Sequence, residues 1–373
     1  MNLLAITRAA GMISVYGQDG YGEIQAKLAA FQRSIPGLNV TLAVLDDVGS
    51  MAAYGGVAAG ADAISLQSAV TRVVAALPGG LTSLDGGLLI LGGGNVVPFF
   101  QVPNPVTNRA TDPDPWVYTD NPYGQTGPSD PGQSLEPSLA VGRICTGAGD
   151  PASAFCALID NLITNHNARP IRAGYVEVTN RVWQDASASV ASALAGAGRV
   201  LVCPDDRVTA LNAGVLDCKY LYCNLHGFQN DPAWKGMDPV RGYVTALTPD
   251  SFSSQYVAGT FVYTDACYGL QTDGRPTDGS CALTLLAQGA AAVVGPTGLA
   301  YGTAPGAPLN LIDADALTRG FFNAALGGGT VGSCLKQARL NFLGSSSTMA
   351  TDVYQQKTLL QFQLLGDPTL AIQ

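Results

Sequence analysis

The stretch YLYCNLHG (220–227) is the clearest indication of the fold in this sequence. It is an uncharged, mostly apolar run that ends in His226 and a glycine, which is typical of a strand buried inside a parallel sheet. A second run of this kind, TFVYTDACYG (260–269), places Cys267 just beyond its last apolar residues. Neighbouring parallel strands end at the same edge of a sheet, where open α/β folds bind ligands. We therefore expect His226 and Cys267 to lie close together at that edge.

Similar short apolar runs alternate with Ala- and Leu-rich segments of helical length along the whole chain, which indicates a parallel or mixed sheet flanked by helices. The predicted strands are 3–7, 40–45, 88–91, 139–144, 174–178, 200–203, 220–225, 260–264 and 291–294. The predicted helices are 22–34, 64–77, 151–165, 186–197, 280–289, 314–326 and 331–343. Segment 98–137 is rich in Pro, Asp, Asn and Gly, so we expect a long functional loop there. We divide the chain into an N-terminal subdomain, 1–144, which includes this loop, and a C-terminal catalytic subdomain, 145–373.

The composition excludes several classes of protein. The 373 residues are 47% hydrophobic and only 13% charged, which indicates a folded protein rather than a disordered one. The net charge of −9 makes nucleic acid a poor partner. The longest nearly uncharged run, 276–312, is broken by Gly and Pro, so we expect no membrane span. The first residues lack the pattern of a signal peptide, which favours the cytoplasm if Met1 is the natural start and leaves a secreted protein if the chain is an excised domain.

The chain contains only two histidines, so any mechanism that depends on histidine has two candidates. His166 lies in the polar stretch TNHNARP, where we expect a solvated surface residue. His226 is either a satisfied core histidine or one partner of the Cys267 thiol, the pairing used in nucleophilic catalysis. Cys218 and Cys223 do not make a zinc site with His226, because residues an odd number apart lie on opposite faces of a strand.

A strand that ends in His-Gly, followed by a strand that ends in Ala-Cys, resembles the catalytic signature of the caspase-like (clan CD) cysteine peptidases. Within that clan the chain resembles the gingipain family, and the similar motifs occur in the family's order. These motifs are LLILGGGNVVP (88–98), TDNPYGQ (119–125), PSLAVGRI (137–144), Ala233-Trp234 and LLGDPTLAI (364–372). The resemblance implies a caspase/gingipain-like α/β fold of two stacked subdomains, with mostly parallel central sheets flanked by helices.

The resemblance also implies the roles of the central residues. Cys267 would attack the scissile carbonyl, and His226 would protonate the leaving amine. The backbone N–H groups of Gly227 and Cys267 would form the oxyanion hole, and glycine at 227 permits a close backbone approach. The family also carries a carboxylate that orients the histidine, at the end of the strand corresponding to GYVEVTN (174–180).

This chain departs from the family at that orienting position. Glu177 is the only carboxylate nearby, whereas simple alignment places Thr179 or Asn180 there. Three arrangements stay open at this point. Glu177 orients His226 from the middle of the strand, an amide replaces the carboxylate, or a bare Cys-His dyad operates.

Substrate selection follows from a looser similarity. Asp185 is similar in position to the acidic residue of the specificity pocket in Arg-cleaving gingipains, although Asp before Ser and Ala is also a good start for a helix. Tyr301 would supply an aromatic wall. An acidic pocket pairs with a basic side chain, so we expect a cysteine endopeptidase that cleaves peptides or proteins after Arg and, less readily, Lys.

Two other functions are compatible with the same fold. One is a regulatory protease of different specificity that processes itself, for which Arg109 and Arg275 are the best-placed cleavage sites. The other is an inactive binding module, although retention of both the His-Gly and the Ala-Cys pair argues against it. By analogy with the family, a structural calcium ion would find ligands in the acidic stretch 111–120. No EF-hand spacing is present, and we assign no metal or other cofactor.

Overall fold

The computed structural model describes residues 1–373 except 79–80, 82–85, 128–129, 195, 208–213, 254, 307–309, 346, 348, 350 and 373. Residues 128–129 of the long loop and residue 195 of the expected helix 186–197 therefore lie outside the described residues. The strands are β1 Asn2–Thr7, β2 Asn39–Val44, β3 Gly86–Leu91, β4 Phe100–Pro103, β5 Trp116–Thr119, β6 Ala140–Ile144, β7 Tyr175–Asn180, β8 Gly198–Cys203, β9 Tyr220–Asn224, β10 Trp234–Asp238, β11 Gly242–Leu247, β12 Phe261–Thr264, β13 Ala292–Pro296 and β14 Phe362–Gly366. The helices are α1 Ala9–Ser34, α2 Val48–Ala52, α3 Ala63–Ala76, α4 Ala152–Asn167, α5 Gln184–Ala191, α6 Pro249–Ser253, α7 Cys281–Ala287, α8 Asp313–Leu326, α9 Val331–Ser345 and α10 Val353–Gln361.

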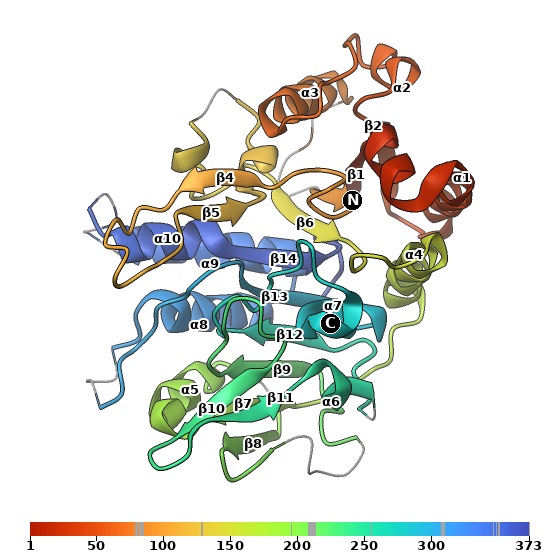
Figure 1. Cartoon of the computed structure of the whole chain (residues 1–373). Helices are drawn as coiled ribbons and strands as arrows, with labels where there is room; N and C mark the ends of the chain where they lie inside the picture. The colour runs from red at the N-terminus through yellow and green to blue at the C-terminus, as the bar shows by residue number, and fades with distance from the viewer. Residues whose placement is uncertain are drawn as a thin grey trace.

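Ten strands form one continuous sheet in the order β2-β1-β3-β6-β14-β13-β12-β9-β7-β8 (Figure 1). Neighbouring strands run parallel except β13 and β14, which are antiparallel. This mostly parallel sheet with flanking helices confirms the expected fold class. All nine predicted strands are present, because buried parallel strands are continuous apolar runs that can be recognised locally.

The two halves of the sheet meet at β14. The strands from residues 1–144 lie on one side of it and the other strands from the rest of the chain on the opposite side. β14 pairs parallel with β6, where Leu365 lies opposite Arg143, and antiparallel with β13. The strands of the two halves therefore run in opposite directions, and the halves lie edge to edge. The division at residues 144 and 145 stays a prediction, since α4 of the second part packs on α1 of the first.

Helices cover both faces of the sheet (Figure 1). One hydrophobic core contains buried residues of α1, α4 and α7, including Leu28, Phe155 and Leu285. A second core lies under α5, α8, α9 and α10 and includes Phe321 and Leu359. None of the described helices combines the length and the apolar character that crossing a membrane requires.

The structure adds elements that the local sequence pattern did not indicate. Segment 98–137, expected as a long loop, contains the antiparallel ribbon β4–β5. A second ribbon, β10–β11, follows His226. Helix α10 and strand β14 close the chain. These strands are short or pair antiparallel outside the main pattern, so their neighbours, rather than their own sequence, determine them.

Candidate active site

His226 and Cys267 follow two adjacent parallel strands. β9 and β12 pair side by side, with Cys223 opposite Thr264. The backbones beyond these strands nearly touch, since a Cβ on Gly227 would lie 1.9 Å from the carbonyl oxygen of Cys267 and 3.2 Å from its nitrogen. Only glycine allows this close approach of the two backbones. The structure thus brings the His-Gly and Ala-Cys segments together.

The imidazole of His226 lies in an aromatic enclosure. Its ring centroid is 4.3 Å from that of Trp183 and 4.9 Å from that of Tyr243. The backbone of His226 exchanges two hydrogen bonds with Lys235 of β10, at 2.7 and 2.8 Å, which fixes the strand end in place. Burial lowers the pKa of His226 below its ordinary value, because the charged imidazolium loses solvation there.

Asn180, the last residue of β7, contacts the imidazole. Its Nδ2 lies 3.1 Å from Nε2 of His226, and its Oδ1 accepts a hydrogen bond of 3.0 Å from the N–H of Met237. Because the Met237 N–H occupies Oδ1, the amide turns its donor toward the ring. Nε2 is then the acceptor and the neutral ring carries its proton on Nδ1. Of the three arrangements left open by the sequence, the contact matches the one in which an amide takes the orienting position.

Glu177, the carboxylate considered for that position, lies in the middle of β7 between Val200 of β8 and Tyr222 of β9. Its side chain is buried, and Oε1 has no hydrogen-bond partner among the described residues. Burial raises the pKa of Glu177 to about 7. In the described part of the chain, its side chain makes no hydrogen bond to His226. No contact therefore supports an orienting role for Glu177.

The Cys267 thiol is held against the loop that follows β13. Its Sγ lies 3.3 Å from the nitrogen and 3.4 Å from the oxygen of Ala300. Burial raises the thiol pKa, while the Ala300 N–H and the positive charge of Lys357 act in the opposite direction. In the described residues, the N–H groups of Gly227 and Cys267 donate to no carbonyl of another residue.

A cavity of about 220 Å³ opens beside Cys267. Tyr301 lines it, as expected for an aromatic wall, and Trp183 lies on its border. Two carboxylates also line it, Asp265 and Asp315. Asp185 is exposed on α5 and is absent from the described lining, so the structure does not bring it to this cavity.

Asp265 and Asp315 form a buried acidic pair. Asp265 accepts hydrogen bonds from Tyr222 and Thr318, at 2.9 and 2.7 Å. Asp315 accepts from Asn224 at 3.1 Å and from the Thr303 N–H at 2.6 Å. Burial and the neighbouring carboxylate raise the pKa of Asp265 to about 8. Sequence reasoning missed Asp315, because acidic residues in the first turn of a helix such as α8 are common for reasons of helix stability.

A buried ionic cluster supports both loops of the site. Lys357 of α10 contacts Asp112 at 2.5 Å and Asp114 at 3.3 Å. Asp112 accepts from the hydroxyl of Tyr301, and Asp114 accepts from the hydroxyl of Tyr268, at 3.0 and 2.7 Å. The cluster therefore holds Tyr268, next to Cys267, and Tyr301, next to Ala300, against segment 98–137.

This cluster occupies most of the carboxylates that the calcium expectation relied on. Asp112 and Asp114 pair with Lys357, and Asp120 pairs with Arg143 at 2.6 Å. Among the described residues, no group of three or more His, Cys, Asp or Glu side chains could hold a metal ion. The residues present in 111–120 thus do not fit a calcium ion.

The expectation for His166 was wrong. It lies in the last turn of α4, and its Nε2 contacts the buried carboxylate of Asp367 at 2.9 Å. Asp367 belongs to the GDPTL motif that follows β14, and its other oxygen accepts from the hydroxyl and N–H of Thr369. The short motif therefore anchors a turn, and the contact across 201 residues could not be found from local sequence.

Comparisons with known proteins support this architecture. The chain matches the family described as peptidase family C25 over residues 7–373. It is similar to the crystal structure of the Arg-specific cysteine proteinase gingipain R, at 13% identity and a TM-score of 0.67, covering 99% of this chain and 77% of that one. A solved structure described only as a protease is also 13% identical, with a TM-score of 0.65, covering 99% of this chain and 78% of that one. No curated protein matches the chain.

The likeness to the solved structures extends over nearly the whole chain and shows that the fold is gingipain-like. The family match likewise includes the strand ends that carry His226 and Cys267. The expected fold and enzyme class are thereby confirmed: the chain belongs to peptidase family C25, the gingipain family, and is a cysteine-type endopeptidase.

Proposed function

We propose that Cys267 is the nucleophile of this peptidase, that His226 transfers the proton, and that the enzyme cleaves after a basic residue. The observation that carries the proposal is the contact of Gly227 with the Cys267 backbone, because it joins the histidine and the thiol at one edge of the sheet. This edge is also where open α/β folds bind substrates.

The proposed reaction has two stages. Sγ of Cys267 bonds to the scissile carbonyl carbon as the thiol proton passes to Nε2, the unprotonated nitrogen of His226, in place of its hydrogen bond from the Asn180 amide. The carbon–nitrogen bond then breaks, and His226 gives the proton to the leaving amine. Water hydrolyses the resulting thioester, which releases the carboxylic acid and restores the thiol. The N–H groups of Gly227 and Cys267 stabilise the oxyanion, a contribution of roughly 3 kcal/mol for each donor in other enzymes.

The cavity beside Cys267 supports a preference for basic residues. A substrate side chain that enters it meets Tyr301 on the wall and the carboxylates of Asp265 and Asp315. No Lys or Arg is among the residues that line the described cavity. A guanidinium can contact both carboxylates, whereas an ammonium contacts fewer acceptors, so we expect Arg to be preferred over Lys. Asp315 takes the role that the sequence suggested for Asp185.

A peptide library that varies the residue before the scissile bond tests the proposal. We expect the wild type to cleave after Arg and Lys, and Cys267→Ala to be inactive. Cys156→Ala is the matched control, because this thiol is also partly exposed but lies in α4. Asp315→Asn should weaken the basic preference, and Asp185→Asn should leave it unchanged. Activity that survives in Cys267→Ala would refute the nucleophile, and an unaltered preference in Asp315→Asn would refute the specificity.

A further inference from the structure

A second cavity, of about 140 Å³, adjoins the residues that follow Cys267 and shares no described lining residue with the first cavity. Tyr268, the residue after the nucleophile, lines it together with Thr297 and Gly298, which precede Ala300 in the loop beside Sγ. Gln229, three residues beyond His226, also lines it. The continuations of both proposed catalytic segments thus meet in this cavity, while Cys267 itself lines the first cavity.

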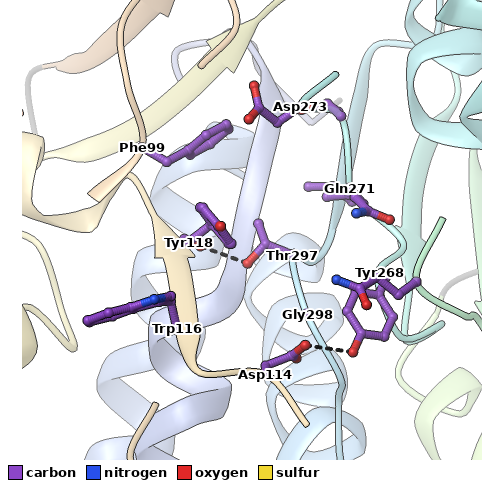
Figure 2. Close-up of a pocket in the computed structure, with 12 residues that line it drawn as sticks. Phe99, Asp114, Trp116, Tyr118, Tyr268, Gln271, Asp273, Thr297 and Gly298 are labelled. Carbon is purple, nitrogen blue, oxygen red and sulfur yellow. Dashed lines mark hydrogen bonds between the residues drawn. The ribbon is translucent and has the colours of Figure 1, made fainter. Parts of the chain in front are cut away.

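The wall of the second cavity is aromatic and acidic. Figure 2 shows Trp116 and Tyr118 along β5, with Phe99 and Asp273 at one end and the bonded pair Asp114–Tyr268 at the other. Trp116 and Tyr118 are 43% and 40% exposed, respectively, so both rings are accessible to a ligand. Rings of this kind attract cations through their electron-rich faces. The face of Phe99 already holds the Arg143 guanidinium, 4.1 Å from the ring centroid, so Trp116 and Tyr118 are the rings that remain for a substrate cation.

The carboxylates in this cavity differ in their partners. Asp114 is already paired with Lys357. The exposed Asp273 makes no hydrogen bond or ion pair with any described residue, so its charge is uncompensated. The residues that line the described cavity include no Lys, Arg or His. The acidic and aromatic lining of this cavity therefore favours a positively charged side chain.

A peptide that crosses Cys267 can reach both cavities. Successive side chains of an extended chain point to opposite sides. When the residue before the scissile bond occupies the cavity of Tyr301 and Asp315, the next side chain points the other way. That residue belongs to the leaving group, which must lie toward His226 to receive its proton. Gln229 and Tyr268 place the second cavity on this side.

We propose that the cavity lined by Tyr118, Tyr268 and Asp273 binds a basic side chain on the first residue after the scissile bond. This inference rests on the proposed function, since it assumes that Cys267 is attacking a peptide in the adjacent cavity. It makes pairs of basic residues the preferred cleavage sites. Asp273 and Tyr118 are then specificity residues, without a part in the chemical steps.

Quenched fluorescent peptides test the inference. They keep Arg before the scissile bond and carry Lys, Arg, Ala or Glu directly after it. We expect the wild type to prefer Lys and Arg over Glu by about tenfold in kcat/KM, as one partly exposed charge contact and a ring contact would give. Asp273→Asn should remove most of this preference, and Asp273→Lys should reverse it toward Glu. Asp278→Asn, an exposed acid outside both cavities, is the matched control.

A substrate with an aminocoumarin leaving group separates the two proposals, because it has no residue after the scissile bond. We expect the wild type and Asp278→Asn to cleave it at the same rate and Cys267→Ala to leave it intact. Equal cleavage of the Lys, Ala and Glu peptides by the wild type would overturn the inference and leave the proposed function standing. If no peptide or coumarin substrate were cleaved in a Cys267-dependent way, the proposed function and this inference would both fail.

Discussion

The amide of Asn180 donates a hydrogen bond to Nε2 of His226, while the Met237 N–H prevents the amide from turning its oxygen to the ring. A carboxylate at this position would stabilise the imidazolium. The amide stabilises the neutral ring instead, because a proton on Nε2 would face the hydrogens of Nδ2. Together with burial, this contact keeps His226 neutral at a lower pH than an ordinary histidine.

Asn180→Asp is therefore expected to raise the pKa of His226 by about one unit or more, as a nearby negative charge favours the imidazolium. The acid limb of the kcat/KM profile should move to higher pH by the same amount, because His226 must be neutral to accept the thiol proton. NMR can follow the imidazole directly, since the chain has only two histidines and His166→Gln assigns the other signal. An unchanged pKa in Asn180→Asp would show that the contact does not control protonation.

Gly227→Ala is expected to lower kcat/KM by about a hundredfold or more, because the new Cβ would overlap the Cys267 carbonyl and force the two strand ends apart. Gly22→Ala is the matched control, since a Cβ there meets nothing within 4 Å. Kinetics and circular dichroism on both variants check the prediction. Wild-type activity in Gly227→Ala would mean that the close approach is unnecessary.

Lys357→Met should destabilise the protein by about 3 kcal/mol or more, because Asp112 and Asp114 would be left as unpaired buried charges. It should also raise the Cys267 thiol pKa, to which the Lys357 charge contributes a lowering effect. The rate of iodoacetamide alkylation against pH measures the thiol, with Lys336→Met, on α9, as the control. If wild type and Lys357→Met gave the same alkylation profile, Lys357 would have a structural role only and no electrostatic effect on the thiol.

Binding of a basic peptide should strengthen as the pH rises toward 8. Burial and the neighbouring Asp315 carboxylate raise the pKa of Asp265, so this carboxyl must lose its proton to pair with a cation. Binding then releases a proton, which favours binding at higher pH. Calorimetry of Cys267→Ala with an Arg peptide, in buffers of different ionisation enthalpy, measures this release. An Ala peptide should release no proton, and equal release from both peptides would contradict the prediction.

Glu177→Gln should stabilise the protein at pH 8 but not at pH 4. Burial raises the pKa of Glu177 from 4.5 to about 7, so the folded state holds a proton that the unfolded state has lost between these values. Stability therefore falls as pH rises through this window, by roughly 3 kcal/mol in total. Urea unfolding at several pH values tests this, with the exposed Glu23→Gln as control. The prediction fails if wild type and Glu177→Gln show the same pH dependence.

The sequence predicted the parts of the molecule that are locally encoded. Each buried parallel strand is an apolar run, and the ends of two such runs identified His226 and Cys267. Asn180 was one of the alternatives at the orienting position, and only its hydrogen bond distinguished it from Glu177. What could not be predicted depends on contacts between distant segments.

Lys357 and Asp315 are examples of such contacts. A lysine in a helix ordinarily indicates a solvated face, yet Lys357 is fully buried because Asp112 and Asp114 reach it from a segment far away in the chain. Asp315 looks like a common helix-start residue until the fold places it beside Asp265. Asp185 is the reverse case, since its position in the sequence suggested a place in a pocket, yet it is exposed on α5 and does not line the cavity beside Cys267.

Strand β14, an interior strand of the sheet, is synthesised near the end of the chain. Among the described strands β14 is the last to leave the ribosome, yet it lies in the interior of the sheet between β6 and β13. Lys357, which fastens both loops around Cys267, emerges just before it. A nascent chain that already carries His226 and Cys267 thus has an unjoined sheet and unfastened loops. Residues 357–366 therefore complete both the sheet and the support of the two loops around Cys267, and a chain that ends before them lacks these contacts.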